Sequence, residues 1–550
     1  MEALIVISII SIVVFLAVRA NRKREIPEVK PSPMQDLKLK VANLETKGRD
    51  YQVFIISENE WNDKSKEIDK WLRSKFEDKE GIYILPEINE KGLYEFTYKT
   101  TGGVIWDILL LLVDSTSKPI IPIEPPEHIK EIVYVNGKAI EIWDDPIIIP
   151  HEHRETLDVF DIVINDDGGD LTNQILDQIN AVPDGTEDRP NVIKFPKGRF
   201  RTEGDLANNY RGIKHIFHLF ERKNLILEGH SENEYTEFYT TAPAVPYENL
   251  VHKNQQSERR HIMVENCYNI KGKWIKIGGS DTTEGYKLEP NIPVFWKGGS
   301  DQGSLKGFPG YHAPWEGEHA FAVHDSEHTL FEECEVDGVW GDGFYVGNGH
   351  PIGSTHTIFR NMKVRRAGRQ GGAASQCQHL LIENVEFIEC RRASIDLEPH
   401  AKWLKVNYVK IRNCKLHAMM VPIAAVGNGD VSKVLIENCE YSGGNFVVCY
   451  DSLKIQRRNT WIVRNNKRTN WFGSPAADID MEMIDDVLIY GNTLQVHDQQ
   501  SKRTAYFPYC KNIEFRENNV GSATIIHADL SEITASGNTP EQELIQLNYI

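Results

Sequence analysis

The sequence predicts a mainly β protein whose larger part is a right-handed parallel β-helix. A five-residue pattern recurs from Leu330–Cys334 to Glu514–Asn518 with a mean spacing of about 26 residues, a period that marks a solenoid. Each copy alternates apolar and polar residues, as a half-buried strand does. One short strand per turn, stacked on its neighbours, gives a rod with a long face for extended ligands. The last residues of the copies form one column: Cys334, Met362, Val385, Cys414, Cys439, Asn466, Asn492 and Asn518.

This column predicts what fills the rod. Asn466, Asn492 and Asn518 should form an internal ladder in which each side-chain amide bonds to the next turn. The chain has eight cysteines, and no two of them show metal-ligand spacing. We therefore expect buried free thiols that fill the core, in preference to a catalytic or redox role.

Residues 1–20 form a membrane anchor or a signal peptide. Residues 3–18 are an almost unbroken apolar run, and four basic residues follow within 19–24. The run is short for a spanning helix, but the flanking basic side chains can snorkel to the membrane surface. Small residues near the end of the run also suit a cleavage site, although no basic segment precedes it. We favour an uncleaved anchor, so the protein is expected to be membrane-anchored or secreted.

Two further regions precede the repeats. Residues 21–50 are predicted to be a linker or stalk, because 25–33 are charged and rich in proline. Residues 51–155 are predicted to be a small α/β domain of unknown role. Its expected elements are strands at 51–56, 81–85 and 104–113 and a helix at 64–76.

The β-helix is expected over residues 156–550, with a capping helix at 170–182. Asp170 suits the N-cap, and Ile175 and Ile179 follow at helical spacing. A strand and a Phe-Pro-x-Gly-x-Phe turn come next, at 191–200. This order resembles the start of the pectate-lyase-like β-helix superfamily, where a helix covers the open end of the rod. The resemblance spans about 160 to 540 and implies the fold; the superfamily includes hydrolases, lyases, epimerases and viral spike proteins.

An insertion at 278–317 interrupts the repeat and is rich in glycine, proline and aromatic residues, among them Trp296 and Trp315. Irregular loops of this length are usually functional, and aromatic rings stack well on sugars. The alternative is an insertion that simply packs on the rod.

A second column of motifs carries the candidate chemistry. Segments 341–347, 369–374 and 393–399 should lie on three successive turns. On the third, Asp396 and Glu398 are expected to point outward together. Neighbouring strands lie about 4.8 Å apart, so the polar residues of these turns should share a patch roughly 10 Å across. Its members are Asp342, Tyr345, Arg369, Gln370, Asp396 and Glu398.

Paired carboxylates are what glycoside hydrolysis needs: one acid with a raised pKa and one base or nucleophile. We expect catalytic roles for Asp342, Asp396 and Glu398. The alternatives are that Asp396 and Glu398 bind Ca²⁺ or belong to a structural polar ladder, and we favour catalysis over them. The expected substrate-binding residues are Tyr345, Arg369, Gln370, His400, Trp296 and Trp315.

The order Gly-Asp-Gly, Arg-Gln-Gly, Ile-Asp-Leu-Glu-Pro also resembles a largely uncharacterised group of bacterial and viral β-helix proteins. Members of that group look like polysaccharide-active proteins. The Gly-His-Gly and Arg-Ile-Lys motifs of polygalacturonases are absent, as is the arginine-rich signature of calcium pectate lyases.

Two functions remain open from the sequence. The first is an enzyme that cleaves or modifies a polysaccharide, either as a hydrolase or as a lyase with Arg369 or Tyr345 as the base. The second is a non-catalytic, glycan-binding attachment protein, viral or on a cell surface, for which a homotrimer is one assembly. The net charge of −18 disfavours nucleic acid as a partner. The scattered histidines match no metal-site spacing.

Overall fold

The computed structural model divides into two compact units, Met1–Pro122 and Ile123–Ile550, which are described separately. In the first unit the structure describes five strands, in 40–57 and 83–113 with gaps. In the second it describes 131–150, 157–206, 213–241, 258–280, 317–347, 353–450, 456–471, 478–494, 503–520, 525–529, 531–539 and 543–547. The apolar run 3–18 lies outside these residues, as do the expected helix 64–76 and most of the insertion, including Trp296 and Trp315. Among the described residues, no helix has the length and apolar character to cross a membrane.

The strands of the first unit form one sheet in the order β1-β2-β5-β4-β3. The expected strand at 104–113 is confirmed, and it is central, because it pairs with β2 on one side and β4 on the other. Residues 40–46, expected in a stalk, instead form β1, whose Thr46 pairs with Arg49 of β2 across a tight connection. The strands are β1 (Lys40–Thr46), β2 (Arg49–Ser57), β3 (Tyr83–Ile84), β4 (Leu93–Lys99) and β5 (Ile105–Val113).

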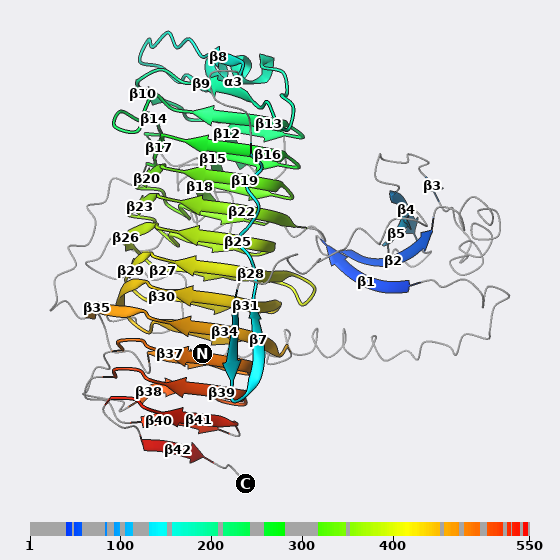
Figure 1. Cartoon of the computed structure of the whole chain (residues 1–550). Coiled ribbons are helices and arrows are strands. Elements are labelled where there is room, and N and C mark those ends of the chain that lie inside the picture. Colours follow the sequence, from blue (N-terminus) through cyan, green and yellow to red (C-terminus); the bar gives the residue numbers. More distant parts are fainter. Residues whose placement is uncertain are drawn as a thin grey trace, which may run out of the picture. The chain divides into compact units, whose positions relative to one another are not determined.

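The second unit is a parallel β-helix, as the sequence predicts, built from three sheets that we call I, II and III (Figure 1). Their strands are parallel, except that the first strand of sheet III runs antiparallel to its neighbour. Sheet I contains β8 (Val159–Asp161), β9 (Asn191–Lys194), β13 (Lys223–Glu228), β16 (Tyr268–Lys273), β19 (Glu327–Glu332), β22 (Ser354–Arg360), β25 (Cys377–Glu383), β28 (Lys405–Arg412), β31 (Asp430–Glu437), β34 (Arg458–Arg464), β37 (Ile484–Tyr490), β39 (Lys511–Arg516) and β41 (Ile533–Ser536).

Sheets II and III complete each turn. Sheet II contains β10 (Gly198–Arg201), β14 (Thr236–Tyr239), β17 (Ile275–Gly278), β20 (Glu335–Asp337), β23 (Lys363–Arg365), β26 (Glu386–Cys390), β29 (Lys415–Ala418), β32 (Glu440–Gly443) and β35 (Lys467–Trp471). Sheet III contains β11 (Asp205–Leu206), β12 (Ile213–Phe220), β15 (Glu258–Glu265), β18 (Gly317–His324), β21 (Phe344–Val346), β24 (Gly372–Ala374), β27 (Ala393–Leu397), β30 (Val421–Val426), β33 (Val447–Tyr450), β36 (Ile479–Met481), β38 (Arg503–Tyr506), β40 (Ile525–Asp529) and β42 (Glu543–Leu547).

The predicted column follows the corner between sheets I and II. All eight of its residues are buried; by register Ile275 precedes Cys334 in the column, and Asn538 follows Asn518. The eight cysteines are free and buried, as expected. The residue before the column position adopts the left-handed conformation, with φ between 54° and 56° at Asn361, Asn384, Asn413, Asn438 and Asn465. Asparagine tolerates this conformation better than most residues, which explains why it recurs there.

The capping helix is α3 (Thr172–Ala181), slightly shorter than expected, and it lies at the β8 end of the rod (Figure 1). Its residues Ile175 and Ile179 are fully buried against the core of the rod. The helix begins after Leu171, so Asp170 is not the residue at the cap position. Asp170 nevertheless accepts hydrogen bonds from the backbone N–H and hydroxyl of Thr172 and from the N–H of Glu203. It therefore ties the helix to the first turn of sheet II.

Residues 131–150, which we call the strap, pack along the outside of sheet I. The sequence placed them in the small domain, but their contacts are with the rod. The strap begins with the hairpin β6 (Glu131–Val135) and β7 (Lys138–Ile142). Apolar side chains of the hairpin and Trp143 pack on four buried residues of sheet I: Tyr408, Leu435, Ile462 and Leu488.

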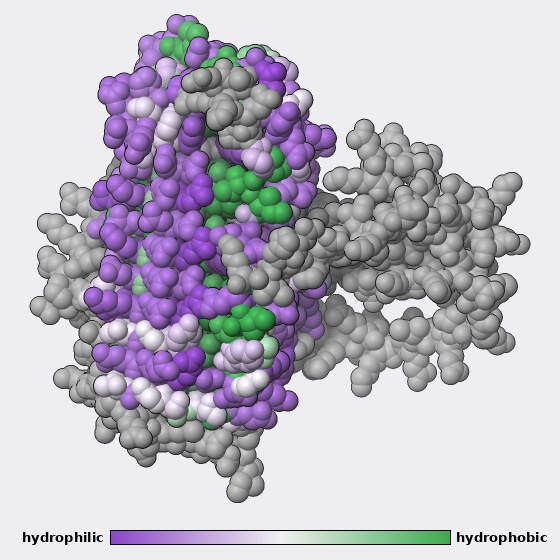
Figure 2. All heavy atoms as spheres, in the orientation of Figure 1, coloured by the Kyte–Doolittle hydropathy of each residue, from purple (hydrophilic) through white to green (hydrophobic). Residues whose placement is uncertain are grey.

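Polar contacts fasten the strap along its length. Glu131 bonds to Arg464, and Asp145 bonds to Lys410 and Arg412. The backbone of Ile147 bonds to His328 and His356. The strap therefore runs from the β39 region toward the capped end. Figure 2 shows a mostly hydrophilic face with two apolar patches along this line; exposed strap residues include Ile132 and Ile147.

Candidate functional site

Three neighbouring strands of sheet III carry the predicted motifs. Tyr345 on β21 pairs in register with Ala373 on β24, which pairs with Asp396 on β27. The register thus aligns Tyr345 with Asp396 two turns away. Two motif positions require glycine, because a side chain at Gly343 or Gly371 would collide with the backbone of the next turn.

Arg369 joins two of the predicted carboxylates. Its Nη1 donates to Asp342 Oδ2 at 3.1 Å, and its Nη2 donates to Glu398 Oε2 at 2.8 Å. Asp342 also accepts the backbone N–H of Gln370 at 3.1 Å. A guanidinium held between two carboxylates is a charge-assisted arrangement that fixes the orientation of both.

Gln370 holds the third carboxylate. Its Nε2 donates to Asp396 Oδ2 at 2.6 Å, while its Oε1 accepts the backbone N–H of Ala393 at 2.9 Å. Oδ1 of Asp396 is buried and has no hydrogen-bond partner among the described residues. One oxygen of Asp396 is therefore oriented by the protein, and the other is left for another group.

The expectation that Asp396 faces solvent is wrong. Glu398 keeps 27% of its side chain exposed, but Asp396 is 5% exposed and Asp342 is 0% exposed. Burial, followed by the nearby charge of Glu398, raises the pKa of Asp396 to about 8. Burial also raises the pKa of Asp342, against the opposing charge of Arg369. Asp396 and Glu398 are thus two residues apart but sit in different environments.

Two other polar residues, His319 and Ser375, border the site. His319 Nε2 lies 3.6 Å from Asp342 Oδ2, and its ring is 4.7 Å from that of Tyr345. The hydroxyl of Tyr345 donates to Ser375 Oγ at 2.8 Å. Sequence reasoning did not assign His319 or Ser375 to the site. Strand register could have placed His319 at the site, because His319 precedes Asp342 by the same 23 residues that separate Phe321 from its partner Phe344.

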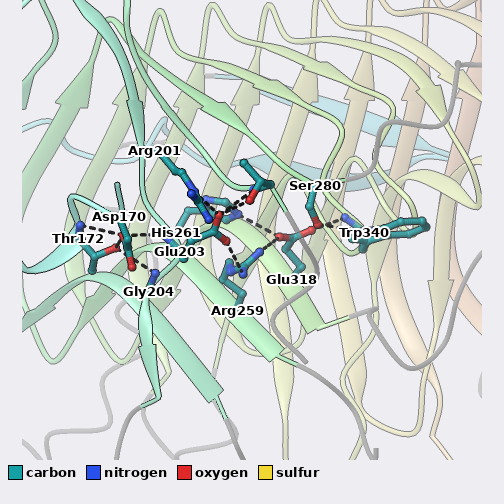
Figure 3. Close-up of polar contacts among 11 residues, drawn as sticks. Asp170, Thr172, Arg201, Glu203, Gly204, Arg259, His261, Ser280, Glu318 and Trp340 are labelled. Carbon is teal, nitrogen blue, oxygen red and sulfur yellow. Dashed lines mark hydrogen bonds and ion pairs between the residues drawn. The ribbon is translucent and has the colours of Figure 1, made fainter. Parts of the chain in front are cut away.

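A buried network fixes the turn that presents Asp342 (Figure 3). Glu318, 2% exposed, accepts hydrogen bonds from Arg259 at 2.9 Å and from the backbone N–H of Trp340 at 2.8 Å, and it lies 3.3 Å from His261 Nε2. The carbonyl of Glu318 also accepts the N–H of Gly341. The network thus holds the two residues before Asp342 and acts as a support for the site.

One further predicted residue, His400, falls within the described part of the chain, whereas Trp296 and Trp315 lie outside it. His400 is exposed on the turn after Glu398, where its carbonyl accepts the side chain of Asn428. No contact described for the chain links the His400 imidazole to the carboxylates. Within the described residues, no group of His, Cys, Asp and Glu side chains is arranged to hold a metal ion.

The Ile-Asp-x-Glu pattern occurs twice on sheet III. Ile479-Asp480-Met481-Glu482 repeats Ile395-Asp396-Leu397-Glu398 in the same register, three strands farther from the cap. Asp480 is therefore about 14 Å along the sheet from Asp396. The motifs predicted from the sequence end at residue 399, so they do not include this second copy.

Comparison with known proteins finds likeness of fold. No known family matches the chain, and no curated protein does. Solved structures similar to it include the surface adhesin PfbA of Streptococcus pneumoniae, with 13% identity and a TM-score of 0.44 over 67% of this chain and 86% of the adhesin. The family 28 exopolygalacturonase of Yersinia enterocolitica has 12% identity and a TM-score of 0.42 over 94% of each chain. The tailspike protein of E. coli bacteriophage HK620, solved with a pentasaccharide, has 13% identity and a TM-score of 0.38 over 69% of this chain and 61% of the tailspike. Likeness this low says nothing about the side chains of the site.

Proposed function

We propose that this chain is a carbohydrate-active β-helix protein that hydrolyses a polysaccharide laid along sheet III. The observation that carries the proposal is the contrast between two neighbouring carboxylates. Asp396 is buried, with its pKa raised to about 8, whereas Glu398 is partly exposed and paired with Arg369. Paired carboxyl groups in unlike environments are the usual basis of an acid and base assignment.

In this mechanism Asp396 is the general acid and Glu398 the general base. Asp396 gives its proton to the glycosidic oxygen as the bond to the anomeric carbon breaks. Glu398 takes a proton from the water whose oxygen attacks that carbon, so one water is consumed and two hydroxyl-ended fragments form. Gln370 orients Asp396, and Arg369 orients Glu398 together with Asp342.

The two bases that the sequence offers for a lyase, Arg369 and Tyr345, are poorly suited to that role. The guanidinium of Arg369 already donates to two carboxylates. Tyr345 has a pKa that burial raises, which makes it a poorer base near neutral pH. The pairing of these groups with one another is also what a purely binding site would contain, so a non-catalytic glycan-binding protein is the second candidate.

A glycan screen separates the three outcomes. The purified chain is incubated with neutral and acidic bacterial and plant polysaccharides, and new reducing ends and ultraviolet absorption are followed together. We expect new reducing ends without an absorbing product. An absorbing, unsaturated product would indicate a lyase, and retention on a polysaccharide without either signal would indicate a binding protein.

A further inference from the structure

A second polar cluster lies on sheet III, nearer the capped end than the carboxylates. Strands β12, β15 and β18 precede β21 in the sheet. Phe220, Glu265 and His324 stand in register on these three strands. His215 and His218 share β12 with Phe220. None of these five residues belongs to the mechanism given above.

Ring contacts and one ion pair hold the cluster together. His218 Nε2 lies 2.8 Å from Glu265 Oε2. The rings of His215 and His218 stack at 4.6 Å, and the ring of Phe220 meets that of His218 edge-on at 5.7 Å. His324 packs against Tyr345 at 5.7 Å. The cluster is thus continuous with the carboxylate site through Tyr345.

Two ring nitrogens of the cluster point to a missing partner. His324 is 7% exposed, and its Nε2 is buried with no hydrogen-bond partner among the described residues; the same holds for Nδ1 of His215. A buried polar atom without a partner costs about 1–3 kcal/mol, so such atoms in native proteins need an explanation. A bound molecule rich in hydroxyl groups would supply it.

The charge of the cluster selects the kind of molecule. Burial lowers the pKa of His324 to about 3 and that of His215 to about 4, so both rings are neutral near pH 7. Neutral imidazoles both donate and accept, as sugar hydroxyls do. Arg260, whose positive charge acts on both rings, is itself paired with Glu258 at 2.8 Å. Glu265, paired with His218, disfavours an anion. Phe220, 47% exposed, offers an apolar ring of the kind that covers the face of a sugar.

We propose that this cluster forms a second subsite for a neutral sugar unit: His215, His218, Phe220, Glu265 and His324. The sugar unit belongs to the same polysaccharide molecule that lies across Asp396. This inference rests on the proposed function. Four strand spacings separate β15 from β27, about 19 Å, so only an extended oligosaccharide reaches both places. The substrate therefore runs along the rod toward the capped end, away from Asp480.

Binding to a graded set of oligosaccharides tests the subsite. The probe is an array of neutral and acidic oligosaccharides from disaccharides to decasaccharides, read with a Glu398→Gln background that leaves them intact. His218→Ala and Phe220→Ala are made in that background. His230→Ala and Tyr509→Ala, which change exposed rings elsewhere on the rod, are the controls. His218 and Phe220 are partly exposed, so their removal should leave the fold intact.

We expect His218→Ala and Phe220→Ala each to lower the affinity for the longest neutral oligosaccharides about ten-fold and to leave the affinity for the shortest ones unchanged. If these variants bind oligosaccharides of every length as tightly as the Glu398→Gln background does, while the unaltered chain turns the polysaccharide over, the subsite is overturned. The proposed hydrolase activity then still stands. If Asp480→Asn instead lowers the affinity for long oligosaccharides, the substrate extends away from the capped end, and the proposed subsite is overturned. Absence of binding to any oligosaccharide, by the unaltered chain as well, would overturn both proposals.

Discussion

Two neighbouring carboxylates, Asp396 on β27 and Glu398 directly after it, lie in different surroundings. Glu398 is partly exposed and pairs with Arg369, whereas Asp396 is covered and receives a hydrogen bond only from Gln370 among the described residues. Desolvation disfavours the charged form, so Asp396 keeps its proton to higher pH. The chemistry assigned to Asp396 therefore depends on burial, which a period-two sequence pattern does not report.

The raised pKa makes the stability of the protein depend on pH. Folding favours the protonated form of Asp396, with a pKa of about 8 against 3.8 for the free side chain. This stabilisation is complete below pH 3.8 and is lost as the pH rises through 8. Asp396→Asn cannot ionise and still offers an acceptor to Gln370. We expect its melting temperature, relative to that of the unaltered chain, to be higher at pH 9 than at pH 5. If the melting temperature of Asp396→Asn relative to the unaltered chain were lower at pH 9 than at pH 5, the burial of Asp396 would be contradicted.

The sequence predicts which residues of the site meet but not how they are buried. Turn spacing alone places Asp342, Arg369, Gln370, Asp396 and Glu398 on three successive turns. It does not report that Asp396 is 5% exposed or that Gln370, from the preceding turn, donates to it. His319 and the residues of the proposed subsite on β12 to β18 are not assigned to the site from the sequence, because the insertion at 278–317 breaks the regular spacing by which neighbouring turns are aligned.

At the scale of elements, the asparagine ladder is the clearest agreement between sequence and structure. Asn466 Nδ2 donates to Asn492 Oδ1 at 3.0 Å, and Asn492 Nδ2 donates to Asn518 Oδ1 at 2.9 Å. Each amide also donates to a strand carbonyl, such as that of Val463 for Asn492. The ladder then continues to Asn538, a member that the predicted column lacks.

Asn492→Leu tests the ladder. The substitution removes the acceptor for both the backbone and side-chain N–H groups of Asn466, which stay buried. We expect the free energy of unfolding, measured with urea, to fall by roughly 1–3 kcal/mol. Asn459→Leu, at an exposed position of β34, is the control and should change it little. Equal effects of the two substitutions would argue against the ladder.

The strap is an element that local sequence patterns do not reveal. Its partners in sheet I are hundreds of residues away along the chain, as between Glu131 and Arg464. The hairpin itself is short, and only its contact with Tyr408, Leu435, Ile462 and Leu488 gives it a hydrophobic surface to cover. An isolated two-stranded hairpin is marginally stable, so the rod holds it in place.

Trp143→Ala should release the strap without unfolding the rod. Trp143 is 2% exposed and meets the ring of Tyr408 edge-on at 5.8 Å. Truncating a buried tryptophan costs about 3–5 kcal/mol, enough to free a short segment. We expect hydrogen exchange at β7 to speed up while exchange in sheet I near Asn492 is unchanged. Tyr134→Ala, 60% exposed on the hairpin, should have no such effect. Unchanged exchange at β7 in Trp143→Ala would show that other contacts hold the strap.

At the scale of the whole rod, the repeated backbone is predictable from the sequence, whereas the surroundings of the candidate site are not. Each turn contacts mainly its neighbours, so a repeated pattern specifies the backbone of all of them. The site appears where the repeats differ from one another, at polar residues that break the regular core pattern. Sheet III carries these differences in sequence, from the histidines of β12 through Tyr345 to the two Ile-Asp-x-Glu strands. A long ligand along one face is the function that such an arrangement fits.

Turnover by Glu398→Gln tests the central claim most directly. Initial rates on the polysaccharide identified by the screen are compared for the unaltered chain, Glu398→Gln and Glu386→Gln. Glu386 is a partly exposed carboxylate on sheet II that pairs with Lys415, so its loss controls for surface charge. Loss of a general base should slow turnover by roughly a hundred- to ten-thousand-fold in Glu398→Gln and leave Glu386→Gln at full rate. A Glu398→Gln protein that turns the polysaccharide over at the unaltered rate would contradict the assignment of the site.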